Sequence, residues 1–269
     1  MTLSPLTRRI LGLVTGLALL VVYAPLALVL LNSFNTSRTF RWPPPGLTTK
    51  WWSAAWHSTG ARDAVWTSVQ VAVIATIIAL VLGTMAALAL QRFRFFGRDF
   101  VSLLIILPIA LPGVVTGIAL ANFFTTMVGI RLGFFTLVVS HATFCIVTVF
   151  NNAVARLRRL GGNLEEASMD LGAGTFRTFY KITLPMLRSS LLAGGLLSFA
   201  LSFDEIIVTT FTVGQGIETL PIWIYQNLFR PNQAPVVNVV AAALIVASIV
   251  PIWVAQKLAG TDESVAAAR

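Results

Sequence analysis

Two adjacent carboxylates, Asp204 and Glu205, interrupt an apolar stretch that is otherwise suited to a membrane. A charged side chain at bilayer depth costs at least about 2.5–3.5 kcal/mol, so two of them in succession call for a function. Carboxylates there can attract a cation or carry protons. At about 100° per residue, one helix through this stretch places Glu205 on the same face as three hydroxyl side chains, Ser198, Ser202 and Thr209. This polar stripe predicts a wet surface that Glu205 faces.

The second carboxylate is expected to face elsewhere. Asp204 is rotated by about 100° from Glu205, so one straight helix cannot aim both at a narrow axis. Either the path is wide or Asp204 contacts a neighbouring helix. A purely structural alternative is also open, in which both acids satisfy backbone or hydroxyl groups between packed helices.

The composition indicates a membrane protein. Of 269 residues, 57% are hydrophobic and 11% are charged, whereas soluble domains have about 45–50% apolar and about 25% charged residues. A water-soluble globule is therefore excluded. The net charge of +9 would suit nucleic acid in a soluble protein, but basic residues of membrane proteins gather in cytoplasmic loops. We expect lipid as the surroundings and no nucleic-acid partner.

Uninterrupted apolar runs predict an all-α integral membrane protein with a single transmembrane domain over residues 1–269. The six expected transmembrane helices are 10–32, 66–90, 100–125, 132–155, 187–212 and 236–258. With the N-terminus inside, thirteen of the nineteen Lys and Arg residues lie on the cytoplasmic side. The excess predicts that both termini are cytoplasmic.

The third expected span and the first outer loop have distinctive residues. Pro108 and Pro112 predict a kink in the third span, and Gly113 and Gly117 predict a close helix contact. The outer loop, 33–65, combines a proline run with several tryptophans. This pattern predicts a stiff turn followed by an amphipathic stretch at the membrane interface.

The cytoplasmic connection 156–186 is too long for a simple hairpin, and its sequence predicts two short helices. Asn163 is expected to cap the first helix, which Gly172 or Gly174 ends. Acidic residues in its opening turn suit the helix dipole.

The second short helix is expected to begin at Thr175 and to end at Pro185. Phe176, Phe179 and Tyr180 add apolar bulk to this cytoplasmic segment. Such bulk requires a partner surface.

The same connection resembles a known signature, that of the membrane permease subunits of ATP-binding-cassette (ABC) importers. This signature is Glu-Ala-Ala, three residues, Gly, nine residues, Ile, one residue, Leu-Pro. The matching residues are Glu166, Ala167, Gly172, Ile182, Leu184 and Pro185, and Ser168 replaces the second Ala. The resemblance implies the type I importer fold, with 156–186 as a coupling loop whose six matching residues engage an ATPase.

Further segments resemble the spermidine/putrescine branch of that family. They are Asn32 to Asn35, Thr48 to Trp52, Ser140 to Cys145, Leu197 to Glu205 and Thr219 to Pro221. The resemblance implies a substrate path that includes Ser202, Asp204, Glu205 and Trp51, the last by stacking on a cation. Many relatives have an acidic residue near the position of Gly113, and its absence here leaves the exact substrate open.

Such a permease pairs with a second homologous permease, two ATPase subunits and an extracytoplasmic solute-binding protein, in the inner membrane of a prokaryote. The sequence has no phosphate-binding loop of the Gly-x-x-x-x-Gly-Lys-Ser/Thr type. ATP and Mg are therefore expected on the partner subunits, with no cofactor or metal on this chain. His141 is expected to pack between helices, since only Cys145 neighbours it at metal spacing.

The sequence leaves three alternatives open. The first is an ABC permease for a different small solute. The second is a secondary transporter in which Asp204 and Glu205 carry protons, which the coupling signature disfavours. The third is an intramembrane enzyme that uses both acids, which the lack of a companion His or Ser motif disfavours.

Overall fold

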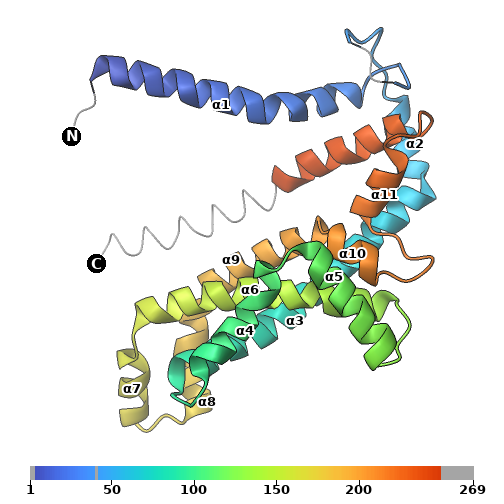
Figure 1. Ribbon diagram of the computed structural model, residues 1–269. Helices are drawn as coiled ribbons and strands as arrows, with labels where there is room; N and C mark the ends of the chain where they lie inside the picture. Colours follow the sequence, from blue (N-terminus) through green and yellow to red (C-terminus); the bar gives the residue numbers. More distant parts are fainter. Residues whose placement is uncertain (1–3, 40–41, 250–269) are drawn as a thin grey trace. The chain divides into compact units, whose positions relative to one another are not determined.

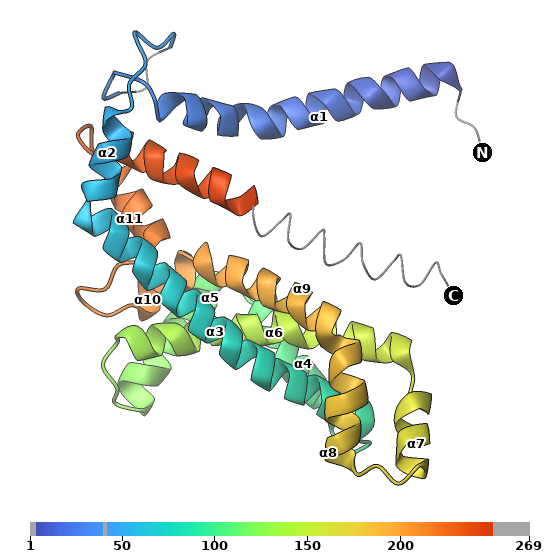
Figure 2. The same ribbon diagram turned by 180° about the vertical axis from the view of Figure 1, so that it is seen from behind.

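The computed structural model describes residues 4–39 and 42–249, which are predominantly helical (Figures 1 and 2). The chain forms two compact units. Of the described residues, one unit contains 4–39, 42–62 and 224–249, and the other contains 63–223. The boundaries fall within helices α3 (Thr59–Arg92) and α11 (Leu220–Asn227).

In the first unit, helix α1 (Pro5–Asn32) corresponds to the first predicted span. The hydroxyl of Ser4 accepts a hydrogen bond from the backbone N–H of Thr7 and so caps the helix, and Pro5 occupies its first position. None of its residues is buried within the described part of the chain. A helix of 28 residues that is apolar on every side requires lipid or another subunit around it.

The outer loop of the first unit folds around Asn35, which pairs with Leu47 in an isolated antiparallel bridge. The predicted amphipathic stretch is helix α2 (Lys50–His57). Phe34 stacks on Trp52 with ring centroids 5.4 Å apart, while Trp56 is exposed. Trp52 thus packs within the unit, whereas Trp56 lies on a surface suited to the membrane interface.

In the second unit, the core forms where α6 (Phe134–Leu160) packs against α9 (Leu184–Phe203). The buried face of α6 repeats every four residues, with Leu137, His141, Cys145 and Val149. The facing surface of α9 is lined by small residues. A Cβ atom added at Gly194 would lie 3.3 Å from the Val149 Cα. Small side chains therefore let the two backbones approach closely.

The third predicted span, 100–125, is broken rather than kinked. Helix α4 (Arg98–Ala110) ends before Leu111, and α5 (Gly113–Asn122) continues into the π-helical turn η1 (Phe123–Met127). The two parts meet at an angle of 107°. Pro112 is the N-cap of α5, where its missing N–H costs no hydrogen bond and its ring prevents α4 from continuing.

The fifth predicted span, 187–212, is also interrupted, so the expectation of a single helix is wrong. Helix α9 ends at Phe203, and the short helix α10 (Ile207–Thr212) begins after three intervening residues. The interruption contains both carboxylates, Asp204 and Glu205. Because carboxylates favour the start of a helix, this pair suits the beginning of α10 and marks a boundary within the apolar run.

The coupling loop contains the two predicted short helices, α7 (Asn163–Asp170) and α8 (Thr175–Thr178). Their N-caps are Gly162 and Gly174, one residue before the expected caps.

The expectation that Pro185 ends the second helix is wrong. A π-helical turn, η2 (Phe179–Thr183), joins α8 to α9, and Pro185 lies in the first turn of α9. A proline interrupts the regular hydrogen-bond ladder of the preceding turn, and a wider turn accommodates it without ending the helix. The result is a continuous helical segment, Thr175–Phe203.

Four described helices are long and apolar enough to cross a membrane, and the broken third span makes up to five. They are α1, α3, α6 and the segment Thr175–Phe203. The sixth predicted span, 236–258, begins in the shorter apolar helix Ala234–Ile249, and its remainder lies outside the described residues.

Candidate functional site

The two carboxylates at the interruption of the fifth span have different surroundings. Asp204 is the C-cap of α9, and its side chain is exposed and makes no hydrogen bond or ion pair with the described residues. Glu205 is half-buried, and its Oε1 accepts a hydrogen bond from the backbone N–H of Val208 at 2.8 Å. Glu205 therefore stabilises the start of α10, whereas the carboxylate of Asp204 is exposed and has no partner among the described residues.

The hydroxyl stripe that the sequence placed beside Glu205 is a packing surface, so the expectation of a wet face is wrong. Ser198, Ser202 and Thr209 are all buried. The Ser198 hydroxyl donates to the carbonyl of Cys145 at 3.2 Å, and the Cys145 thiol donates to the carbonyl of Ser198 at 3.4 Å. These bonds join α9 to α6 and leave Asp204 and Glu205 as the polar groups accessible at the interruption.

His141 links the two sides of the interruption from the facing helix α6. Its Nδ1 lies 2.8 Å from the Ser202 hydroxyl, and its Nε2 lies 2.8 Å from the Thr209 hydroxyl. In either tautomer, one ring nitrogen donates and the other accepts, so a neutral imidazole satisfies both contacts. The sequence prediction that His141 packs between helices agrees with these contacts, and no cluster of metal-binding side chains occurs in the described ranges.

Replacing His141 with Leu is expected to lower the free energy of unfolding in detergent by about 1–3 kcal/mol. The change removes two buried contacts, each worth about 0.6–1.7 kcal/mol inside a membrane protein. Thermal unfolding followed by circular dichroism measures the effect. Thr143→Val is the matched control, because the Thr143 hydroxyl bonds only within its own helix, to the carbonyl of Ser140. Equal stability of both variants would contradict a role for His141 at the interruption.

The second side of the site is α5, the part of the third span beyond its break. Helices α5 and α10 pack together, as the two glycines of the third span predict. A Cβ atom at Gly113 would lie 3.3 Å from Ile207, and one at Gly117 would lie 2.8 Å from Phe211. The two broken spans therefore pack against each other through α5 and α10.

Trp51, the expected aromatic partner of a cation, is anchored in the first unit. Its Nε1 donates to the carbonyl of Asn35 at 2.9 Å, and the side chain is half-buried. The ammonium of Lys50 lies 5.6 Å from the centroid of its ring. The indole thus already faces one cation of this chain.

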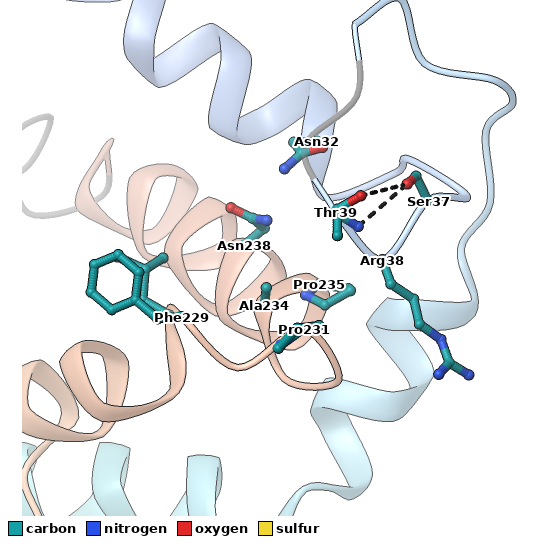
Figure 3. Close-up of a pocket in the computed structure, with 10 residues that line it drawn as sticks. Asn32, Ser37, Arg38, Thr39, Phe229, Pro231, Ala234, Pro235 and Asn238 are labelled. Carbon is teal, nitrogen blue, oxygen red and sulfur yellow. Dashed lines mark hydrogen bonds between the residues drawn. The ribbon is translucent and has the colours of Figure 1, made fainter.

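The first unit also contains a pocket of about 300 Å³ between the outer loop and the segment before helix Ala234–Ile249 (Figure 3). Its lining is Asn32, Ser37, Arg38, Thr39, Leu228, Phe229, Pro231, Ala234, Pro235 and Asn238. Arg38 is the charged residue among them, and no carboxylate is present. This lining disfavours a polycation, so the acids at the interruption are the better candidate for a cation site.

The coupling loop has a well-defined turn between α7 and α8. Gly172 has φ of +82°, a conformation that side chains rarely adopt. Its N–H donates to the carbonyl of Met169 at 2.9 Å, and the N–H of Ala173 donates to the carbonyl of Ser168 at 3.1 Å. This pair of bonds is a Schellman motif, which the sequence prediction of a glycine turn anticipated.

The outer surface of this loop is apolar. The exposed large side chains are Leu164, Met169, Leu171, Phe176 and Tyr180, and Leu171 is 89% exposed. Glu166, the acid of the signature, is also exposed. An apolar surface with an acidic residue beside it is typical of a protein interface.

Glu165 holds the loop to the helix bundle, a role that the signature did not indicate. It forms an ion pair with Arg92 at the end of α3, and it accepts a hydrogen bond from the Thr183 hydroxyl at 2.7 Å. Ser168, the departure from the signature, lies 3.0 Å from the Thr178 hydroxyl. Of the two adjacent acids, Glu165 is therefore bonded to the bundle, whereas Glu166 is exposed.

A double-mutant cycle with Arg92→Gln and Glu165→Gln is expected to give a coupling energy of about 0.5–1 kcal/mol. This range suits a partly exposed ion pair, since the two side chains are 28% and 17% exposed. Chemical unfolding of the four proteins measures it. Asp170→Asn with Arg92→Gln is the control cycle and should give no coupling, because Asp170 is exposed at the far end of α7. A similar coupling energy in both cycles would show that the overall charge of the loop stabilises the protein, and that the specific pair of Arg92 and Glu165 does not.

Residues 79–259 match the family described as binding-protein-dependent transport system inner membrane component. The spermidine/putrescine transport system permease protein PotC of Escherichia coli (strain K12) is 36% identical over 239 residues, covering 88% of this chain and 89% of that protein. The putrescine transport system permease protein PotI of the same strain is 35% identical over 250 residues, covering 88% and 85%.

Solved structures show the same fold. A bacterial ABC transporter involved in the import of the acidic polysaccharide alginate aligns with a TM-score of 0.71 at 16% identity, covering 97% of this chain and 99% of that chain. A MetNI methionine ABC transporter in an inward-facing conformation aligns with a TM-score of 0.59 at 17% identity, covering 72% and 92%. By the family match and the identity to these permeases, the chain belongs to the family of inner membrane components of binding-protein-dependent transport systems.

Proposed function

We propose that this chain is the permease subunit of an ATP-driven importer and forms half of the translocation path for a polyamine-like cation. The observation that carries the substrate class is the interruption of the fifth span, which places Asp204 and Glu205 side by side outside a regular helix. The names of the relatives, spermidine and putrescine permeases, support the same class.

The chemistry of the interruption fits a polyamine. Two carboxylates at bilayer depth attract separated ammonium groups, and the exposed Asp204 can contact one directly. Glu205 keeps one oxygen on the backbone N–H of Val208 at the start of α10, so its other oxygen is the one that can accept from an ammonium group.

The coupling loop supports ATP as the energy source. Its exposed apolar surface and Glu166 suit docking of an ATPase, and the glycine turn at Gly172 fixes the angle between α7 and α8. We assign the signature residues to this docking: Glu166, Ala167, Gly172, Ile182, Leu184 and Pro185. A proton-coupled secondary transporter would have no use for such a surface.

The surroundings of α1 support a second permease subunit. No residue of this 28-residue apolar helix is buried within the described part of the chain. A homologous permease beside it, two ATPase subunits at the coupling loops and an extracytoplasmic binding protein would complete the importer. The excess of basic residues in the predicted inner loops supports cytoplasmic termini in the bacterial inner membrane.

Uptake in proteoliposomes tests the function. The full complex is expected to accumulate radiolabelled spermidine only with ATP and the binding protein, and a proton ionophore should leave uptake unchanged. The isolated chain should not bind ATP in a filter assay, because it lacks a phosphate loop. Loss of uptake with the ionophore would favour the secondary transporter, and transport of a neutral solute alone would refute the polyamine assignment.

A further inference from the structure

The end of the second unit nearest the coupling loop contains a second, basic cavity. It has a volume of about 260 Å³ and lies between the end of α3, the start of α4 and the end of α6. Two guanidinium groups line it, those of Arg98 and Arg158. Neither makes a side-chain hydrogen bond or an ion pair within residues 4–39 and 42–249.

The charge balance of the cavity favours an anion. Asp99 is the one acid in its lining, so Arg98 and Arg158 leave a net charge of about +1. Asn151, Ser102 and Gln91 add neutral hydrogen-bonding groups. The volume is below the about 300–1,000 Å³ of pockets that enclose a whole drug-sized ligand. A small, singly charged group with several acceptor oxygens, such as a phosphodiester, matches this lining.

The adjoining turn indicates where such a group would come from. Residues 91–99 alternate basic and aromatic side chains, and a neighbouring pocket shares Arg98 and includes Arg94 and Phe100. Phe93, Phe96 and Phe100 are exposed, Phe96 completely. Aromatic side chains favour the membrane interface, and basic pockets between helices on the cytoplasmic side favour anionic headgroups.

We propose that the cavity formed by Arg98 and Arg158 binds the phosphodiester of an anionic phospholipid, with the exposed phenylalanines of the 91–99 turn against its acyl chains. The proposal rests on the cytoplasmic orientation given under the proposed function. Because α3 ends at Arg92, the partner of Glu165, the lipid would border the segment that holds the coupling loop.

Lipid binding to the purified full-length chain tests the proposal without the ATPase, so its failure and a failure of the transport function are distinguishable. Native mass spectrometry measures the affinities for phosphatidylglycerol and phosphatidylcholine. We expect tighter binding of phosphatidylglycerol. Arg98→Gln with Arg158→Gln should weaken that binding about 30-fold, at about fivefold for each arginine near an anionic headgroup.

Two further variants keep the test decisive. Arg177→Gln with Lys181→Gln removes the same charge from exposed positions outside the cavity, and should leave the affinity within about twofold of the wild type. Arg98→Lys with Arg158→Lys retains the charge and should keep the preference for phosphatidylglycerol.

Three results would overturn the proposal. The first is equal binding of the two lipids by the wild-type chain. The second is an equal loss of affinity in the cavity variant and its charge-matched control, which would indicate general surface attraction. The third is displacement of phosphatidylglycerol by excess inorganic phosphate, which would identify a soluble phosphate site.

Discussion

Uptake of spermidine is expected to fall at least about 100-fold when Asp204→Asn and Glu205→Gln are combined. Each charge-assisted hydrogen bond to a carboxylate is worth about 1.5–3 kcal/mol, so two together amount to more than a factor of 100. Both substitutions preserve side-chain shape, and the amide oxygen of a glutamine at position 205 can still accept from the Val208 N–H. Radiolabelled uptake by the reconstituted complex measures the loss, and copurification of the subunits confirms assembly.

The single variants separate the roles of the two acids. Asp204→Asn should lower uptake more than Glu205→Gln, because Asp204 is exposed, whereas one carboxylate oxygen of Glu205 already accepts a hydrogen bond from the Val208 N–H. Asp63→Asn removes an exposed carboxylate near the outer start of α3 and is the control, with uptake unchanged. Normal uptake by the double variant would exclude charge attraction at the interruption.

Replacing Gly172 with Val is expected to reduce ATP-driven uptake about 5- to 30-fold while membrane insertion stays intact. A left-handed backbone costs a residue with a side chain about 1–2 kcal/mol, which corresponds to this range. The penalty is conformational, since a Cβ atom at Gly172 would meet no atom within 4 Å. The strained turn would change the angle between α7 and α8.

The matched control is Gly172→Asn, because asparagine tolerates the left-handed region. It should retain most of the uptake and the stimulation of the ATPase by the binding protein. Both activities are measured on the same reconstituted complexes. Normal activity of Gly172→Val, or equal loss in both variants, would contradict a conformational role for this turn in coupling.

The helices were the more predictable part of the structure. Long apolar runs predict α1, α3 and α6 because burial in lipid depends on composition over about 20 residues. The turn at Gly172 was predictable because a glycine between two short helices is a local signal. The prediction that Pro185 ends a helix was wrong because proline is also tolerated in the first turn of a helix, where it lies in α9.

The site was less predictable because it depends on distant contacts. Helical periodicity places Ser198, Ser202 and Thr209 on one face, but the interruption at Asp204 changes what that face contacts. His141 is 61 residues from Ser202 and 68 from Thr209, so no local pattern shows that it joins them. Two adjacent acids inside an apolar run were the one available signal, since acidic residues favour the start of a helix. The roles of these residues in transport stay predictions.

Helix α9 connects the coupling loop to the carboxylates along one straight element. Its 20 residues span about 30 Å at 1.5 Å per residue. One end follows the π-helical turn η2, where the chain can bend, and the other end is capped by Asp204. A tilt of about 5° of α9 would therefore displace the carboxylate end by about 3 Å, which is the length of a hydrogen bond. In the proposed importer, a small movement of the coupling loop would thus be enough to make or break a contact with a cation.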